Sequence, residues 1–226
     1  MEDLRKRLAD KLKLKASSGE EIKLTYFGIR GRAEISRLIL AHAGVKFDDI
    51  RLTGEEFAEV KALLPYGSLP ILEHRGAVLC ESMAIAKYLA EECGLAGQDN
   101  LAKAQADEVV MAINGMFESI GKFMFAPEAE KAALKKKFCG ELLPKVLGQL
   151  EARLCQRGGQ FLAGNRLSYA DLMVVALQDA LLSEVIGAGA AMERCPRLTH
   201  LYERMVAMPN IKQWRGARPV DPMLKN

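Results

Sequence analysis

Thiol chemistry is the first possibility to consider in this chain, because its sequence contains five cysteines. They are Cys80, Cys93, Cys139, Cys155 and Cys195. Their number is odd, and no two of them have the C-x-x-C spacing of a redox dithiol or a zinc ribbon. A disulfide framework and a structural zinc site are therefore both disfavoured, and we expect a reduced, cytoplasmic chain.

Histidine, nucleotide and hydrolase motifs offer no better candidates. His42, His74 and His200 fall in separate predicted elements, without the short spacing of metal ligands. The sequence has no Gly-x-x-x-x-Gly-Lys loop for phosphates and no nucleophile elbow. We therefore expect no metal, no nucleotide cofactor and no serine-hydrolase chemistry.

The composition is typical of a soluble globular chain. Of the 226 residues, 50% are hydrophobic and 27% are charged, and 32 basic against 29 acidic residues leave a net charge of +3. Because the two signs nearly balance, the chain has no strong field for phosphates, which argues against nucleic-acid binding. No apolar run approaches the roughly 20 residues that span a bilayer.

Residues 1–20 are interpreted as a leader ahead of the first domain. Leu4, Leu8 and Leu12 recur at helical spacing among charged residues, which favours a surface helix or a disordered segment. A basic amphipathic anchor for a membrane or a partner is the alternative. The leader lacks the apolar run of a secretory signal peptide, and residues 16–19 have the composition of a flexible linker.

Residues 21–94 alternate short strands with helices, which predicts one α/β domain. The expected elements are strand 22–26, helix 32–43, strand 45–52, helix 54–63, strands 69–73 and 77–80, and helix 82–92. The last two strands form a hairpin around Arg75 and Gly76, so the four-stranded sheet must be mixed. Ser82 is placed as the N-cap of the last helix. This order, with Pro70 opening the third strand, is that of a thioredoxin-like domain.

Helical periodicity replaces the strand signals in the second half of the chain. Residues 95–101 are the expected linker, and residues 102–226 the expected all-α bundle domain. The predicted helices cover residues 106–123, 134–154 with a bend at Pro144, 170–182 as a buried central helix, and 198–206. Ser168 and Asp171 are spaced as a capping box, with Leu167 and Leu172 as a hydrophobic staple, so this motif is assigned to folding.

Four motifs, in order along the chain, resemble the sigma class of cytosolic glutathione transferases. They are K-L-T-Y-F-x-x-R-G-R-A-E at 23–34, L-P-Y-G-S-L-P-I-L-E at 64–73, E-S-M-A-I-A-K-Y-L at 81–89 and G-N-R-L-S-Y-A-D at 164–171. The resemblance covers about residues 22–220. It implies a thioredoxin-like domain followed by a helical domain, the same fold that the periodicity predicts independently.

The resemblance makes Tyr26 the catalytic residue, at the end of a strand and just before a helix. A phenol with a pKa of about 10 is protonated at neutral pH, so it can donate a hydrogen bond to the thiolate of glutathione. Lowering a thiol pKa by about two units requires about 2.7 kcal/mol, which one charge-assisted hydrogen bond and a helix dipole can supply. Arg32 matches the family's arginine near the sulfur and the electrophile. No cysteine stands at this junction, so dithiol exchange is disfavoured.

The same resemblance implies a set of contacts with glutathione. Leu69 would present its backbone N–H and C=O to the cysteinyl part, following Ser68 and preceding a cis Pro70. Ser82 would hold the γ-glutamyl carboxylate at a helix N-terminus. Glu81 would hold the α-ammonium, although sigma enzymes usually have Gln at this position.

Three further positions correspond to glutathione-binding residues of the family. One of them departs from the usual residue, and another would act in the partner subunit. Phe57 stands where sigma enzymes commonly have Trp, so one side-chain N–H donor is missing. Lys61, one helical turn later, can pair with the glycyl carboxylate. Asp107 matches an acid that reaches the γ-glutamyl ammonium in the partner subunit, which implies a homodimer. A solvated helix face is the alternative for Asp107.

The second substrate, a small hydrophobic electrophile, is expected between the two domains. The candidate wall residues are Phe27, Met111, Met116 and Leu177. Methionines at helical spacing are more often part of a plain core. Met173 occupies a position that is aromatic in vertebrate-type prostaglandin D synthases, which disfavours isomerase activity.

We therefore interpret the sequence as a cytoplasmic glutathione transferase with a role in detoxification, using glutathione as co-substrate and no metal. Two alternatives stay open: a glutathione-dependent prostaglandin D isomerase, and a non-catalytic, crystallin-like member of the family. The intact set of Tyr26, Lys61, Glu81 and Ser82 favours an enzyme, because a purely structural protein need not keep it.

Overall fold

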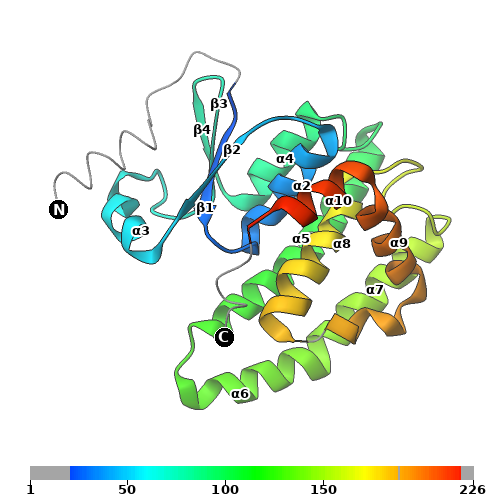
Figure 1. The fold of residues 1–226 in the computed structure, drawn as a ribbon. Helices are drawn as coiled ribbons and strands as arrows, with labels where there is room; N and C mark the ends of the chain where they lie inside the picture. The colour runs from blue at the N-terminus through cyan, green and yellow to red at the C-terminus, as the bar shows by residue number, and fades with distance from the viewer. Residues whose placement is uncertain (1–20, 188, 220–226) are drawn as a thin grey trace.

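The computed structural model describes residues 21–187 and 189–219 of the chain (Figure 1). The predicted leader, residues 1–20, lies outside the described residues. A mixed four-stranded sheet with its helices comes first and a helical domain follows, so the predicted fold class is confirmed. In the described part of the chain, no helix is long and apolar enough to cross a membrane.

The sheet has the spatial order β2-β1-β3-β4. Its strands are β1 (Lys23–Phe27), β2 (Asp48–Leu52), β3 (Ile71–His74) and β4 (Ala77–Cys80). β1 is parallel to β2 and antiparallel to β3, and β3 is antiparallel to β4. The predicted hairpin is present, and Arg75 and Gly76 both take positive φ in its two-residue turn.

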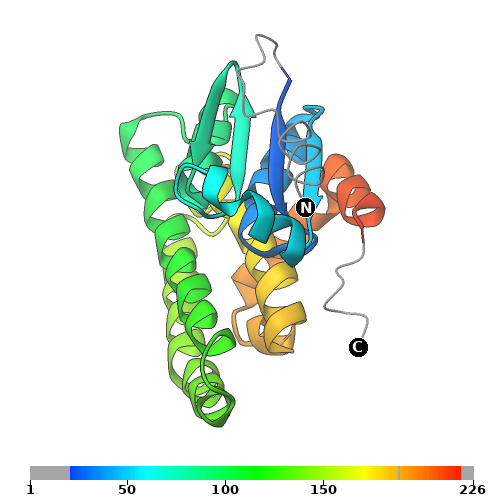
Figure 2. The ribbon, with the colours of Figure 1, turned by 90° about the vertical axis from the view of Figure 1, so that its left-hand side faces the viewer.

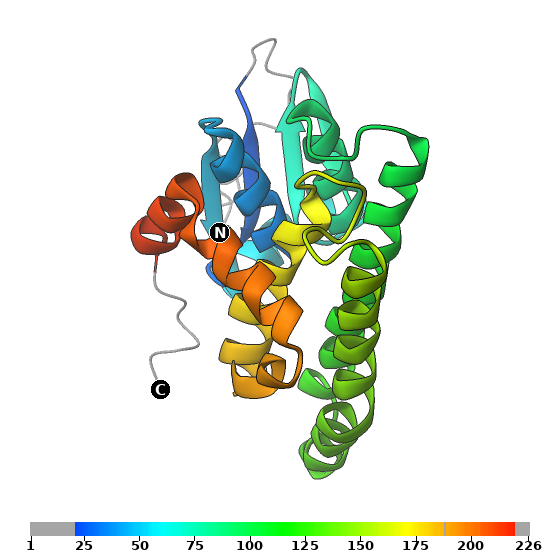
Figure 3. The same ribbon diagram turned by 90° about the vertical axis from the view of Figure 1, so that its right-hand side faces the viewer.

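Helices cover both faces of this sheet. They are the 3-10 helix η1 (Gly31–Ala33), α2 (Glu34–Ala43), α3 (Gly54–Val60), the 3-10 helix η2 (Lys61–Leu63) and α4 (Ser82–Glu92). α2 and α4 pack on one face, and α3 lies on the other (Figures 2 and 3). The predicted N-cap at Ser82 is wrong, because Ser82 is the first residue of α4 and Glu81, with φ of 67°, is its N-cap.

The second domain is helical throughout. Its elements are α5 (Asn100–Met124), α6 (Glu128–Lys137), the π-helical η3 (Phe138–Leu142), α7 (Leu143–Gln156), α8 (Tyr169–Ala176), the π-helical η4 (Leu177–Ile186), the 3-10 helix η5 (Gly189–Arg194), α9 (Pro196–Ala207) and α10 (Pro209–Ala217). α5 and α7 run side by side (Figures 2 and 3).

Several of the predicted helices differ in detail, and η5 and α10 were not predicted. The helix predicted at 106–123 is α5, which begins at Asn100, inside the predicted linker 95–101. The 134–154 helix starts earlier and contains a π-helical turn ahead of Pro144, where a wider turn accommodates a ring that lacks an N–H. The predicted helix 170–182 changes from α to π geometry at Leu177. The helix after Pro209, α10, was missed because its apolar pattern is short.

The predicted capping box starts α8. The backbone N–H of Ser168 donates to Oδ2 of Asp171 at 2.8 Å, and Oδ1 of Asp171 accepts the N–H of Leu162 at 2.8 Å. Asp171 is fully buried, and this burial raises its pKa to about 6 despite the hydrogen bonds that favour the carboxylate. One acid therefore both begins the helix and fixes the loop before it.

A buried ion-pair network joins the last helix to the first domain. Arg218, just after α10, pairs with Glu34 of α2 at 2.5 Å and with Asp179 of η4 at 2.7 Å. Arg215 pairs with Asp179 at 2.7 Å. Burial alone would raise the pKa of Asp179, but the two arginines hold it below its usual value. The network therefore ties the first residue of α2 to the helical domain, and α2 also packs against α8 and α10.

Candidate active site

Tyr26 lies one residue before the end of β1, and its side chain is almost completely buried. Its hydroxyl oxygen accepts the backbone N–H of Arg32 at 3.3 Å. Gly31, with φ of 43°, lies against the ring, and a Cβ there would be 2.8 Å from that oxygen. A hydroxyl that accepts from a backbone N–H keeps its own O–H as a donor. The backbone N–H of Arg32 therefore orients the Tyr26 hydroxyl at the start of η1.

A cavity of about 310 Å³ adjoins this junction. It is lined by Arg32, Ser68, Leu69, Glu81, Ser82, Met83, Met111, Asn114 and Glu118. Five of these were predicted as site residues, and they come from three separate segments of the first domain. The Leu69–Pro70 peptide bond is cis, as predicted. The fold thus brings together residues that are far apart in the sequence around one hollow.

The N-terminus of α4 supplies one wall of this cavity. Glu81 takes a positive φ that is rare for a residue with a side chain and costs about 1 kcal/mol. Its side chain makes no capping hydrogen bond, while Ser82 is buried as the first helical residue. The first N–H groups of an uncapped helix attract a carboxylate. This wall therefore suits a ligand with a carboxylate next to a cationic group, because the helix N-terminus attracts the carboxylate and the Glu81 side chain attracts the cation.

Arg32 has partners that the sequence did not reveal. Its Nη1 donates to Oδ1 of Asn114 at 2.8 Å, and Nδ2 of Asn114 donates to Oε1 of Glu118 at 2.9 Å. Both residues belong to α5, on the side away from its apolar stripe, and neither was predicted as a site residue. The spacing of Met111, Asn114 and Glu118 along one helix face is the signal that could have found them.

Phe57 and Lys61 lie beside the cavity without lining it. Phe57 packs edge-on against Phe27 with ring centroids 5.2 Å apart, and Phe27 packs in the same way against Tyr26 at 5.3 Å. Nζ of Lys61 lies 5.9 Å from the centroid of the Phe57 ring. An aromatic row therefore connects Tyr26 to an exposed lysine. A role for either residue in binding glutathione stays a prediction.

Asp107 is bound within its own chain. Its carboxylate accepts from Nζ of Lys87 and, at 2.5 Å, from the hydroxyl of Tyr169. Burial and the Asp107 carboxylate both raise the pKa of the Tyr169 phenol, which therefore stays a donor at neutral pH. Asp107 is absent from the lining of the cavity described above. Its reach to a partner subunit stays a prediction.

The candidate wall residues for a second substrate divide into two groups. Met111 lines the cavity and is 51% exposed. Met116 and Leu177 are fully buried, as is Met173, so these side chains pack the core. Phe27 is half-buried in the aromatic row beside Tyr26.

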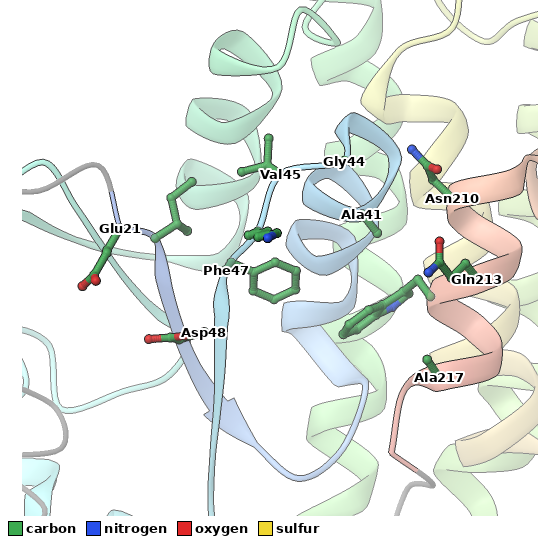
Figure 4. A pocket seen from close by; sticks show the side chains of 12 residues that line it. Glu21, Ala41, Gly44, Val45, Phe47, Asp48, Asn210, Gln213 and Ala217 are labelled. Atoms are coloured by element: carbon green, nitrogen blue, oxygen red, sulfur yellow. The ribbon is translucent and has the colours of Figure 1, made fainter.

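A larger cavity, of about 620 Å³, lies between α2, β2 and α10 (Figure 4). The rings of Phe47 and Trp214 face each other there with centroids 5.6 Å apart. None of the predicted site residues lines it. Its size alone is therefore no reason to place the chemistry there. In the described residues, no cluster of His, Cys, Asp and Glu could hold a metal ion.

Comparison with known families identifies both halves of the chain. Residues 22–91 match the model of the glutathione S-transferase N-terminal domain, and residues 114–218 match that of the C-terminal domain. Together these matches cover most of the chain. The protein therefore belongs to the glutathione S-transferase family.

Individual relatives bear two kinds of name. Hematopoietic prostaglandin D synthase of Gallus gallus is 37% identical over 202 residues, which are 87% of this chain and 96% of that protein. Glutathione S-transferase 3 of Caenorhabditis elegans is 36% identical over 202 residues, again 87% of this chain and 96% of that protein. The solved structure of prostaglandin synthase D of Nilaparvata lugens has a TM-score of 0.81 and 30% identity, covering 88% of this chain and 100% of that one.

Proposed function

We propose that this protein is a sigma-class, cytoplasmic glutathione transferase that ionises glutathione with Tyr26 and directs the thiolate to small hydrophobic electrophiles. One observation carries the proposal. The Tyr26 hydroxyl accepts the N–H of Arg32, and Arg32 lines the cavity at which Leu69, Glu81 and Ser82 meet, although Tyr26 itself does not line it. A phenol donor at a helix start stabilises a thiolate over the thiol.

Each residue of the cavity takes a defined part of glutathione in this proposal. The backbone of Leu69 aligns the cysteinyl part as an added strand would. The uncapped start of α4 holds the γ-glutamyl carboxylate, and the Glu81 side chain holds the neighbouring ammonium. Lys61 is assigned the glycyl carboxylate. The sulfur then lies by Tyr26 and Arg32, and no metal or covalent enzyme intermediate takes part.

The experiment is a titration of glutathione bound to the protein, followed by thiolate absorbance against pH. The bound thiol should titrate about two units below its free value of about 8.5. Binding of S-methylglutathione, which has no thiol, serves as the control for recognition of the peptide alone. An unshifted pKa would contradict the mechanism, and absence of binding by either peptide would contradict the function.

Prostaglandin isomerisation is a second candidate, supported by the names of several relatives that are 32–37% identical to this chain. Both candidates use the same ionised glutathione, so the titration cannot separate them. A panel of electrophiles beside a prostaglandin endoperoxide substrate does. Turnover of the endoperoxide alone would make the isomerase the primary activity. Turnover of neither substrate class would favour a non-catalytic member of the family.

We also propose a symmetric homodimer, in which Asp107 reaches the glutathione site of the partner subunit. Activity should then fall with dimer content on dilution, measured by sedimentation and conjugation in the same samples. One solved relative, with a TM-score of 0.80 and 29% identity over 89% of this chain and 99% of that one, is described as monomeric Na-GST-3 of Necator americanus. A fully active monomer here would refute the borrowed Asp107.

A further inference from the structure

The turn between Tyr26 and Arg32 is held by side chains from outside the turn. Neither η1 nor α2 begins with a side-chain cap. Instead, Nη1 of Arg37 donates to the carbonyl oxygen of Ile29 at 2.9 Å and to that of Arg30 at 3.2 Å. Nη1 of Arg51 donates to the carbonyl oxygen of Gly28 at 3.3 Å. Two guanidiniums thus hold three consecutive carbonyls.

Asp49 joins these two arginines. Its Oδ1 accepts from Nε of Arg37 at 2.9 Å, and its Oδ2 accepts from Nε of Arg51 at 2.8 Å. The Arg37 side chain is fully buried, and those of Asp49 and Arg51 are 15% and 16% exposed. Each guanidinium therefore uses one edge for the carboxylate and another for the turn. A planar fork fixes direction as well as distance in such contacts.

The same cluster touches the catalytic ring. The guanidinium carbon of Arg37 lies 5.9 Å from the centroid of the Tyr26 ring. The Tyr26 hydroxyl lies against Gly31 and accepts from Arg32, both of which follow directly after the held carbonyls. A shift of the turn would therefore move the N–H that orients the hydroxyl. Displacements below 1 Å are enough to weaken a preorganised hydrogen bond.

We infer that Asp49 is a positioning residue for glutathione ionisation, acting through Arg37 and Arg51 on the turn that aligns Tyr26 and Arg32. The inference rests on the proposed function. Asp49 lies on β2 and does not line the cavity. Its effect is therefore on the orientation of the phenol and leaves the peptide-binding wall at α4 unchanged.

The test compares Asp49→Asn with Asp48→Asn. The two residues are neighbours on one strand and lose the same charge, but Asp48 is exposed and points to the other side of the sheet. In Asp49→Asn, the pKa of bound glutathione should rise by about 0.5 to 1 unit, so that at a pH well below the bound pKa of the parent protein roughly three- to tenfold less thiolate forms. Affinity for S-methylglutathione should stay within about twofold, and Asp48→Asn should match the parent protein in both.

A second pair of variants tests the proposal in case Asp49→Asn does not fold. Arg51→Lys keeps a charge at a half-buried position but cannot hold Asp49 and Gly28 together, so it should shift the thiol pKa in the same direction by less. In Asp49→Glu, the pKa of bound glutathione should return most of the way to that of the parent protein, because this variant keeps a carboxylate.

The outcomes separate the two proposals. If the parent protein ionises glutathione and Asp49→Asn and Arg51→Lys ionise it equally well, the positioning role of Asp49 is overturned. Loss of S-methylglutathione binding in step with the thiolate would mark a merely structural role and overturn it as well. A parent protein that leaves the thiol pKa unshifted would overturn the proposed function, and this inference with it.

Discussion

The N-termini of helices α2 and α8 are held in position in opposite ways. At α8, Asp171 accepts the backbone N–H of Ser168 three residues earlier, and the whole arrangement is buried. At α2, no side chain caps the helix, and the preceding turn is held by Arg37 and Arg51. The N–H of Arg32 is there donated to the Tyr26 hydroxyl.

Under the proposed function, the difference separates a helix start that serves folding from one that serves catalysis. A capping box satisfies its own N–H groups, so nothing remains to bind a ligand. When arginine side chains hold the carbonyl oxygens of the preceding turn, the backbone N–H groups at the helix start are left to orient the Tyr26 hydroxyl. The cost is that several distant residues must be in place before that site exists.

The largest effect is expected at the folding start. Asp171→Ala leaves the buried N–H groups of Leu162 and Ser168 without their acceptor, which should lower the free energy of unfolding by about 3 kcal/mol. Urea denaturation measures it. The control is Asp99→Ala, which removes an exposed N-cap of α5 and should cost about 1 kcal/mol. Equal costs at the two sites would contradict the role of burial.

The next largest effect is expected from removing the Tyr26 hydroxyl, which should lower the reaction rate and leave the free energy of unfolding unchanged. Tyr26→Phe removes one hydroxyl and keeps the ring, so the bound thiol pKa should rise by about 1 to 2 units. Conjugation at a pH well below the bound pKa of the parent protein should then fall roughly tenfold to a hundredfold, because the thiolate population there falls tenfold per unit. Thiolate absorbance and initial rates check both values.

The matched control for that change is Tyr169→Phe, at the first residue of α8. It removes a hydroxyl bonded to Asp107 and should cost about 1 kcal/mol of stability without moving the thiol pKa. If Tyr26→Phe leaves the thiol pKa and turnover intact, Arg32 or a backbone N–H becomes the donor instead.

A smaller effect should come from glycines at the two ends of α2. Gly31→Ala and Gly44→Ala both place a side chain at positive φ, which should cost about 1 kcal/mol each in urea denaturation. A Cβ at Gly31 also meets the Tyr26 hydroxyl, whereas at Gly44 its nearest neighbour is 3.7 Å away. The thiol pKa should therefore rise in Gly31→Ala alone. A rise in both variants would trace the effect to general strain.

The smallest effect is expected from removing residues 1–19. They precede β1 and the region of family similarity, which begins at residue 22. Conjugation rate and melting temperature should stay nearly unchanged, because both helix starts lie within that region of similarity. A large loss of either would show that the leader packs on the fold.

Local patterns in the sequence determined most of the elements and one of the two helix starts. The strand alternation gave the mixed sheet, and the spacing of Ser168 and Asp171 gave the capping box, because both depend on residues a few positions apart. The motif around Tyr26 predicted the position of the catalytic site, and that assignment stays a prediction. The π-helical turn before Pro144 and the short helix α10 could not be seen, because each depends on packing against other helices.

Tertiary structure alone decided what surrounds Tyr26. Asn114 is 82 residues from Arg32 in the chain, and its hydrogen bond arises only when α5 packs beside the sheet domain. Asp49 reads in sequence as one more acid on an edge strand, and only the parallel pairing of β1 and β2 brings it behind the turn. Periodicity reports which face of an element is buried, whereas a site assembled from several elements depends on how those faces meet.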